Sequence, residues 1–557
     1  MRELRLIPAA ALVWAVTLAV VLFHEPVAWA LVGGAVVIAL VLRSPGQALV
    51  MGPVGLAACV LGRWRVRLAR AEIPEEIRAR VAGEPRGVGG KRWLVPVRVE
   101  DYPAQVPLFV ESEQPITLSR GSLVMARVHW NPSDKPGLSR WVGTVREWQT
   151  GTPRGIDAWV ADVHERFIVA VREQVGEASQ GLIPGMVLGN TTAQGEAERE
   201  LYLSTGLSHL SAVSGTNVTI VATCVFLLCR LCSLGPRLQL SAAVLAVVVF
   251  FVLVGPEPSV LRATLTGLVG LLAVAHSATF PPLHGLSVAV IVLLLYDASL
   301  ATQWGFVLSV AATAGIVVLY PLLYRWIAGL ECGGVRLPDV LVRALAVAVA
   351  ADVTTAPLVA AMSGRVSLVS VLANLMVSPA VAPITIGGLM AVAALLLPGR
   401  GEAIALWVIE PCAWWIHHAA QRCAALPLST VEATPAWVVV AYAWIAYLVV
   451  LGHGRKVVGV LCLGLALGAW SGRRAPPVDM ASLRVAVVDT EEEAAALSVA
   501  SRGEGSRPQM IVVRDGSGQP ADYPTQTAEG IPVLFPERDG QVTLHGDGTQ
   551  HAADGRF

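Results

Sequence analysis

The residues best suited to chemistry lie in one polar stretch between long apolar runs, residues 206–218, GLSHLSAVSGTNV. We call it the polar segment. Polar groups in hydrocarbon cost free energy, so they usually face a bundle interior or a wet cavity. Read as a helix with about 100° per residue, it places His209 and Thr216 on one face and Ser214 beside Asn217. Ser214-Gly215 also permits close helix approach or a local break. A helix-packing seam satisfied by neighbouring helices is the alternative interpretation.

Three further polar residues stand inside apolar runs. Arg262 lies near the start of its run, where it either snorkels to the interface or forms a fixed positive charge on a path for phosphates. Asp352 is the natural candidate to pair with a basic residue, and Asn374 can line a cavity or bridge helices. From the sequence we therefore predict a polar path through the apolar helices. Its residues are His209, Ser214, Gly215, Asn217, Arg262, Asp352 and Asn374.

Apolar helices must position these residues. Of 557 residues, 54% are hydrophobic and only 15% are charged, against roughly 25% charged in ordinary soluble domains. Runs of about 18 or more apolar residues can cross the hydrocarbon core as helices, which satisfy their own backbone groups. We predict a polytopic α-helical membrane protein with about 12–13 spans, an extracytoplasmic OB-like β-domain and a small soluble C-terminal tail.

The composition along the chain divides it into five parts. Residues 1–62 hold three predicted spans, 7–23, 27–42 and 46–62, and residues 63–150 hold the β-domain, whose alternating runs lie within 84–150. Residues 151–180 contain an amphipathic surface helix. Residues 181–471 form the main membrane domain, in which the run 366–397 is expected to kink or break at its prolines. Residues 472–557 form the tail. The remaining predicted spans are 210–229, 238–254, 258–275, 281–296, 304–327, 340–363, 403–420, 435–452 and 456–471.

The β-domain interleaves aromatic and basic residues, a combination that suits base stacking and phosphate contact. Small barrels also bury their aromatic residues, which is the alternative. The candidate DNA-binding residues are Lys91, Arg92, Trp93, Arg127 and Trp130.

Lys and Arg in the short loops predict the orientation. If Arg2, Arg5 and Arg43 are cytoplasmic, the β-domain and the tail both lie outside. The arginines at 63–70 disagree with this arrangement, but the alternation of the later loops favours it.

The polar segment resembles the motif of the ComEC family of competence proteins, which carry transforming DNA across the bacterial inner membrane. The matching residues are Thr205-Gly206, His209-Leu210, Ala212, Ser214-Gly215 and Asn217-Val218. Residues 182–192, 259–263, 304–317 and 355–383 resemble other family blocks in the family's order. Asn217 stands where many members have histidine, which puts a role for that imidazole in doubt.

The resemblance implies a channel for single-stranded DNA in the bacterial cytoplasmic (inner) membrane. It also implies two partners, a surface DNA receptor and a cytoplasmic ATPase motor; a homo-oligomer is possible. Many members carry a metallo-β-lactamase-like nuclease domain. We expect none here, because the tail has only His545 and His551 and no clustered H-x-H-x-D-H. The tail is also acidic, with thirteen Asp and Glu against eight Arg over residues 472–557.

Other functions are less well supported by the sequence. GVGGKRW (87–93) is not a P-loop, so no ATPase is expected, and we predict neither enzyme activity nor cofactors nor a metal site. A secondary transporter of a small anion, with Arg262 at its site, is the alternative function. An intramembrane hydrolase is disfavoured because His209 and Ser214 would lie about 140° apart around a helix.

Overall fold

The computed structural model describes most of the chain up to residue 448 and parts of the remainder. Before 448, it leaves out residues 1–4, 24, 89–91, 115, 117, 134–135, 212, 276–280, 330, 333–334 and 427–428. Beyond 448, it describes residues 451, 459, 484–490, 493–494, 508, 510–516, 521, 523–527, 531–544 and 550–552. The predicted span 456–471, together with Lys91 and His545, therefore lies outside the described residues, apart from residue 459.

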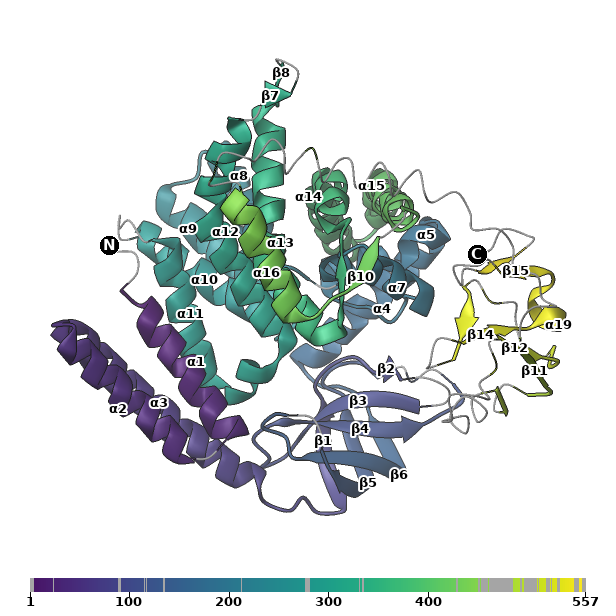
Figure 1. The fold of residues 1–557 in the computed structure, drawn as a ribbon, viewed down its shortest axis with the longest axis horizontal. Helices are drawn as coiled ribbons and strands as arrows, with labels where there is room; N and C mark the ends of the chain where they lie inside the picture. The colour runs from purple at the N-terminus through teal and green to yellow at the C-terminus, as the bar shows by residue number, and fades with distance from the viewer. Residues whose placement is uncertain are drawn as a thin grey trace. The chain divides into compact units, whose positions relative to one another are not determined.

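Three apolar helices open the chain. They are α1 (Ile7–Leu22), α2 (Glu25–Val41) and α3 (Pro45–Ala69), and they pack on one another (Figure 1). Helix α3 runs past the predicted end at residue 62, so residues 63–69 belong to the helix and not to the β-domain. Arg65 makes hydrogen bonds from this last part of the helix, because its Nη2 donates to the carbonyls of Leu295 and Tyr296 at 2.8 and 2.6 Å.

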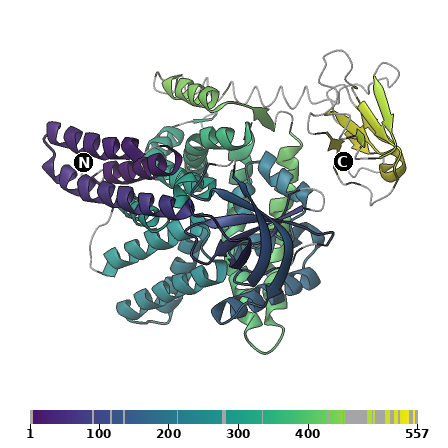
Figure 2. The ribbon, with the colours of Figure 1, turned by 90° about the horizontal axis from the view of Figure 1, so that it is seen from below.

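A β-barrel-like domain follows α3. Its strands are β1 (Glu76–Val81), β2 (Arg86–Gly87), β3 (Arg92–Val99), β4 (Gln105–Glu111), β5 (Leu123–Pro132) and β6 (Trp141–Gly151). The order β1-β5-β6-β4-β3 closes because β1 also pairs with β3, and the β4–β6 pair is parallel. The curved strands are seen in Figure 2. Alternate residues point inward, as in β1, where Ile77, Ala79 and Val81 are buried.

A 19-residue helix and three shorter ones connect this domain to the main helical part. They are α4 (Ile156–Gln174), α5 (Glu177–Gln180), α6 (Leu182–Leu188) and α7 (Glu196–Ser204). Helix α4 buries Val163, Phe167 and Val171 on one side, which is the apolar side predicted from its period.

The remaining helices of the main part are apolar. Their bounds are α8 (Gly215–Leu231), α9 (Pro236–Val254), α10 (Pro258–Ala275), α11 (Pro282–Tyr296), α12 (Trp304–Ala328), α13 (Asp339–Ser363), α14 (Ser370–Leu395), α15 (Gly401–Ala424) and α16 (Pro435–Leu448). Helices α12 and α13 pack together, as do α14 and α15. Two-stranded pairs, β7 (Glu331–Cys332) with β8 (Val335–Arg336) and β9 (Arg365–Ser367) with β10 (Thr430–Glu432), join some of them.

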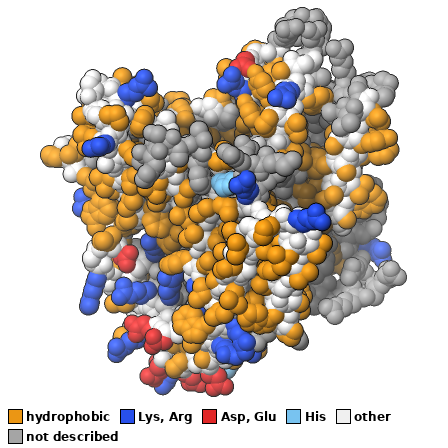
Figure 3. Space-filling model, turned by 90° about the vertical axis from the view of Figure 1, so that its left-hand side faces the viewer, with side chains coloured by type: hydrophobic (Ala, Val, Ile, Leu, Met, Phe, Trp, Pro, Cys, Tyr) orange, Lys and Arg blue, Asp and Glu red, His pale blue; other side chains and the backbone are white. Residues whose placement is uncertain are grey.

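Five of the described helices are long and apolar enough to cross a membrane: α3, α9, α12, α13 and α14. Six shorter helices are apolar as well. Hydrophobic side chains cover much of the described part of the face shown in Figure 3, as expected for a surface that faces lipid. The chain is thus a mostly helical membrane protein, while the count of about 12–13 spans stays a prediction.

Helix α14 is continuous from Ser370 to Leu395, so the run is not broken at Pro379 and Pro383, while a kink there stays a prediction. Pro379 lacks the N–H that would bond the carbonyl of Leu375. The hydroxyl of Ser378 donates to that carbonyl at 3.2 Å. Side-chain hydroxyls of this kind allow a membrane helix to tolerate proline.

Residues 456–557 belong to a separate compact unit. Its described strands are β11 (Val485–Val488), β12 (Met510–Val513), β13 (Thr525–Gln526) and β14 (Pro532–Leu534), in the order β11-β12-β14-β13, with β11, β12 and β14 parallel. A second sheet pairs β15 (Val542–Leu544) with β16 (Gln550–Ala552).

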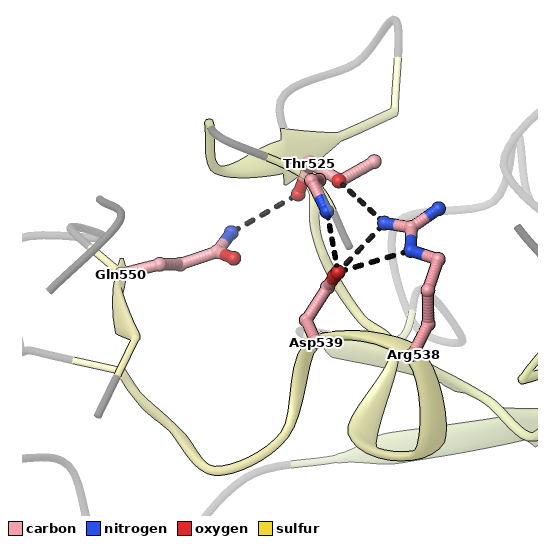
Figure 4. Close-up of polar contacts among 5 residues, drawn as sticks. Thr525, Arg538, Asp539 and Gln550 are labelled. Carbon is pink, nitrogen blue, oxygen red and sulfur yellow. Dashed lines mark hydrogen bonds and ion pairs between the residues drawn. The ribbon is translucent and has the colours of Figure 1, made fainter. Parts of the chain in front are cut away.

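The short helix α19 (Pro536–Asp539) of this unit contains a nearly buried ion pair. Arg538 donates two hydrogen bonds to the Asp539 carboxylate, at 3.0 and 2.9 Å (Figure 4). The guanidinium also lies 3.7 Å from the ring centroid of Phe535, and the Ala521 N–H donates to Asp539. Since both charges are satisfied, we interpret this pair as structural.

Candidate functional site

The polar segment is mostly not helical. A 3₁₀ turn covers Ser208–Leu210, and α8 begins only at Gly215. The prediction that His209 and Thr216 share a helix face is therefore wrong. The helix is delayed because Gly206 has a positive φ of 71° and packs against Ser370, while the Val213 carbonyl accepts a hydrogen bond from the Ser259 hydroxyl at 2.9 Å. Non-helical backbone at membrane depth is tolerated where it is buried in protein or lines a cavity.

Asn217 is buried and connects helices; it does not line an open polar path. Its side-chain N–H donates to the Met186 carbonyl at 2.9 Å. Its oxygen accepts from the hydroxyls of Ser214 at 3.2 Å and Thr385 at 3.3 Å. Asn217 is only 2% exposed. One amide thus ties together α6, the start of α8 and α14.

Arg262 lies in α10 and is 7% exposed. Its Nε donates to the Ser309 hydroxyl of α12 at 2.8 Å. A Cβ built on Gly215 would lie 2.5 Å from Arg262 Nη2, so the guanidinium sits directly against the first residue of α8. Among the described residues, no Asp or Glu forms an ion pair with it.

This position is electrostatically unusual. A helix N-terminus carries about +0.5 of an elementary charge, and its first N–H groups have no partner within the helix. Arg262 adds a full positive charge at the same point. Two positive groups placed together without an acid lower the stability of the fold. They also form a suitable environment for an anion.

Within the part of the chain that the structure describes, Asp352 does not pair with a basic residue, contrary to the sequence-based expectation. Its Oδ1 accepts from the Ser370 hydroxyl at 2.8 Å, and its Oδ2 accepts from the Tyr442 hydroxyl at 2.6 Å. Two neutral donors, from α14 and α16, take the place of the expected cation. Hydropathy could not identify Tyr442, which lies 90 residues away in the chain.

Ser370 connects Asp352 to the polar segment. A Cβ on Gly206 would lie 2.7 Å from the Ser370 Cβ and 2.8 Å from its Oγ, so the two residues are in tight contact. The Gly206 carbonyl lies 3.2 Å from His209 Nδ1. Asn374, one turn further along α14, donates to the Ser370 carbonyl at 3.0 Å. Residues 206–215 therefore begin at Gly206, which contacts Ser370, the hydrogen-bond partner of Asp352. They end at Gly215, which contacts Arg262.

The four described residues of the predicted DNA-binding set, which leaves out Lys91, make contacts within their own barrel. Arg127 pairs with Glu76 at 3.0 Å, and Arg92 lies 3.7 Å from Glu111. Trp130 donates from Nε1 to the Pro74 carbonyl at 2.8 Å. Both Trp93 and Trp130 pack against the barrel core. These contacts favour the structural interpretation of the aromatic residues.

Sequence reasoning missed the junction between the β-domain and the helices. The Glu84 carboxylate accepts from the Thr191 N–H at 3.0 Å, and Arg199 donates to the Thr191 carbonyl at 3.2 Å. On the other side, the Arg120 guanidinium lies directly over Gly255, whose φ is 96°. Burial raises the pKa of the Glu84 carboxyl to about 7. The Thr191 N–H and nearby arginines oppose this shift.

The Glu84 pKa predicts a pH-dependent junction. Because the folded-state pKa is raised, the folded protein binds the proton more tightly than the unfolded chain does. The stabilisation is complete below the unfolded value of 4.5 and is lost as the pH rises through about 7. We expect Glu84→Gln to remove this loss, so the variant gains stability relative to wild type between about pH 5 and about pH 8.

Thermal unfolding of the detergent-solubilised full chain measures this difference. The pKa of Glu198 is also raised to about 7 by burial. Glu198 titrates in both proteins, so its contribution cancels in the difference between Glu84→Gln and wild type. Glu111→Gln, on the same barrel, is the control. A constant difference between Glu84→Gln and wild type across this pH range would contradict the assignment.

Among the described residues, no group of three or more His, Cys, Asp or Glu side chains is arranged to hold a metal ion. Asp489, at the end of β11, lies 3.8 Å from Arg514 in an exposed ion pair.

Long apolar helices, a β-barrel-like domain and a buried cation beside a broken helical segment define a membrane protein with a polar site inside its helical part. The particular family follows from comparison: residues 186–456 match the family model described as Competence protein. These residues therefore form a competence-protein domain, which confirms the resemblance of the motif blocks to the ComEC family. No curated protein and no solved structure matches the chain.

Proposed function

We propose that the chain conducts single-stranded transforming DNA across the bacterial cytoplasmic membrane, as a multi-pass channel. The observation that carries the proposal is the Arg262 guanidinium, which is buried at the N-terminus of α8 with no acidic partner among the residues that the structure describes. Single-stranded DNA presents one negative phosphate per nucleotide, and pores select ions by charges fixed along the path. The competence domain supports DNA as the anion in preference to a small solute.

Arg262 and the first N–H groups of α8 would contact one phosphate at a time. A single site of this kind holds a strand weakly enough for the next phosphate to replace it, which conduction requires. His209 in the polar segment and Asn374 in α14 would face the strand further along, while Asn217 would hold the helices in place.

We propose that the β-barrel-like domain is an OB-like module on the outer side of the membrane. Its closed five-strand order with one parallel pair supports the OB-like assignment. The strand would reach it from a surface DNA receptor and be pulled from inside by an ATPase motor. The chain would act without nuclease activity of its own; incubation of the purified full chain with labelled DNA and divalent metal, with and without chelator, tests this part.

Complementation of a deletion strain tests the function. A strain lacking this chain should lose transformation by linear DNA, and expression of the wild-type chain should restore it. Unchanged transformation in the deletion strain would refute the proposal. Loss of uptake of a small anion, with normal transformation, would favour the secondary transporter.

The orientation gives a separate prediction. Reporter fusions at residues 110 and 520 should be active with an enzyme that works only outside the cytoplasm and inactive with one that works only inside. A cytoplasmic signal at either position would overturn the orientation or the span count.

A further inference from the structure

Asp352 occupies the centre of its helix. Helix α13 runs over 25 residues from Asp339 to Ser363, and Asp352 is the fourteenth of them. Because α13 is one of the helices able to span a membrane, its centre lies near the bilayer midplane when it does so. An ionisable side chain at this depth is costly and usually faces the bundle interior or a wet cavity.

The elements packed against Asp352 bring no cation to it. Helices α14 and α16 contain no Lys, Arg, His, Asp or Glu. Helix α16, which packs on α13 as Figure 1 shows, contributes Tyr442. The charged residues of α12, α13 and β9 are Arg325, Asp339, Arg343 and Arg365, with the titratable Tyr320 and Tyr324 on α12.

These other groups lie toward the helix ends. Tyr324 donates to Asp339 at 2.6 Å, and Arg343 pairs with Asp339 at 2.7 Å. Asp339 is thirteen residues from Asp352, roughly 20 Å along a helix. Arg365 is equally far along the sequence in the other direction and lies 3.9 Å from Glu200. Asp352 therefore has two hydroxyl donors and no neutralising charge among the described residues.

We propose that Asp352 is a proton-binding site whose loading is coupled to the polar segment, an inference that rests on the proposed DNA channel and extends it. The surrounding apolar helices favour the neutral acid, whereas the hydroxyls of Ser370 and Tyr442 stabilise the carboxylate. A group balanced in this way can take a proton from one side and release it to the other. One proton binds a carboxylate oxygen and is returned to water, and no other bond changes.

The contact with Gly206 transmits the change. When Asp352 is ionised, the Ser370 hydroxyl donates to it at 2.8 Å. When a proton binds Asp352 Oδ1, that oxygen becomes the donor, so Ser370 has to accept or rotate away; a proton on Oδ2 makes the same demand of Tyr442. Ser370 is packed tightly on Gly206, so a rotation of its hydroxyl alters this contact first. Because residues 206–215 end at the Arg262 site, proton binding would alter the geometry with which that site contacts a phosphate.

Carbodiimide labelling tests the site in the wild-type chain. Dicyclohexylcarbodiimide reacts with protonated carboxyls in apolar surroundings and not with exposed carboxylates. In membranes containing the full chain, we expect labelling of Asp352 about tenfold above that of Asp339, the exposed and ion-paired acid of the same helix. The labelling should decrease as the pH rises. Equal labelling of the two acids, or none at Asp352 at any pH, would overturn the proposal.

Proton flux into vesicles tests the coupling. The full chain is reconstituted with a pH-sensitive dye inside, and a membrane potential is imposed. We expect measurable flux for wild type, about tenfold less for Asp352→Asn and an intermediate loss for Tyr442→Phe. Asp339→Asn is the matched control and should behave as wild type. Wild-type flux in Asp352→Asn would refute the proposal, and the labelling experiment decides it if that variant does not fold.

Transformation of the same variants separates the two proposals. Low flux with normal transformation would overturn the coupling and leave the DNA channel intact. If transformation survives deletion of the whole chain, the DNA channel itself is refuted. Low flux together with low transformation, at normal abundance of the protein in the membrane, is the result that supports both.

Discussion

Replacement of Arg262 by glutamine is expected to lower transformation roughly 100-fold without lowering the amount of protein in the membrane. A charge-assisted hydrogen bond to a phosphate contributes about 2–3 kcal/mol, and each 1.4 kcal/mol is tenfold. Burial of the guanidinium without an acid opposes folding, so its removal should leave thermal stability equal or higher. Loss of function with gain of stability is the pattern of a residue retained for activity.

Two further variants sharpen this result. Arg262→Lys keeps the charge but loses the planar fork and the Nε that bonds Ser309, so transformation should fall to an intermediate level. Arg237→Gln, an exposed arginine at the start of the adjacent α9, is the matched control and should transform as wild type. If Arg262→Gln transforms normally at normal abundance, the guanidinium does not contact the DNA. If it disappears from the membrane, Arg262 is a packing residue.

The helices were predictable because their signal is local. An apolar run of span length must be helical in lipid whatever it packs against. The run 238–254 is observed as Pro236–Val254, and 340–363 as Asp339–Ser363. The β-barrel-like domain was predictable for the same reason, since alternation fixes which face of a strand is buried. Its first strand, Glu76–Val81, alternates in the same way but lies before the predicted alternating runs, which begin at residue 84.

The site was predictable as a set of residues and not as an arrangement. Hydropathy identifies Arg262 and Asp352 as polar groups in apolar surroundings, but their partners lie in distant segments. Pairing an acid with a base was the simplest electrostatic expectation, and hydroxyl groups from two other helices satisfied the acid instead. Ser214 did carry a usable signal, because serine is favoured directly before the first helical residue, and α8 begins at Gly215.

The junction at Glu84 could not be inferred from sequence at all. Its partner is a backbone N–H, and any residue other than proline at position 191 supplies the same donor. The raised pKa of Glu84 arises from burial between two parts of the chain that the sequence treats separately.

Replacement of Asn217 by alanine is expected to reduce the amount of protein in the membrane several-fold, in contrast to Arg262→Gln. The amide makes hydrogen bonds to Met186, Ser214 and Thr385. Leaving buried polar groups without partners costs about 1–3 kcal/mol each. Thr385 keeps a second acceptor in the Val381 carbonyl, so the loss falls mainly on Met186 and Ser214. A change of about 1–2 kcal/mol alters abundance several-fold in cells.

Asn217→His tests whether the hydrogen bonds or the residue type matters, since histidine is the residue that many family members carry at this place. A neutral imidazole has one donor and one acceptor, which suffices for Met186 and for one of the two hydroxyls. We therefore expect near-normal abundance and melting temperature for this variant. Asn374→Ala, which removes one amide bonded within its own helix, is the matched control and should change stability little. An Asn217→Ala protein that is abundant and stable, yet transforms poorly, would place this amide on the DNA path and remove its role as a connector of α6, α8 and α14.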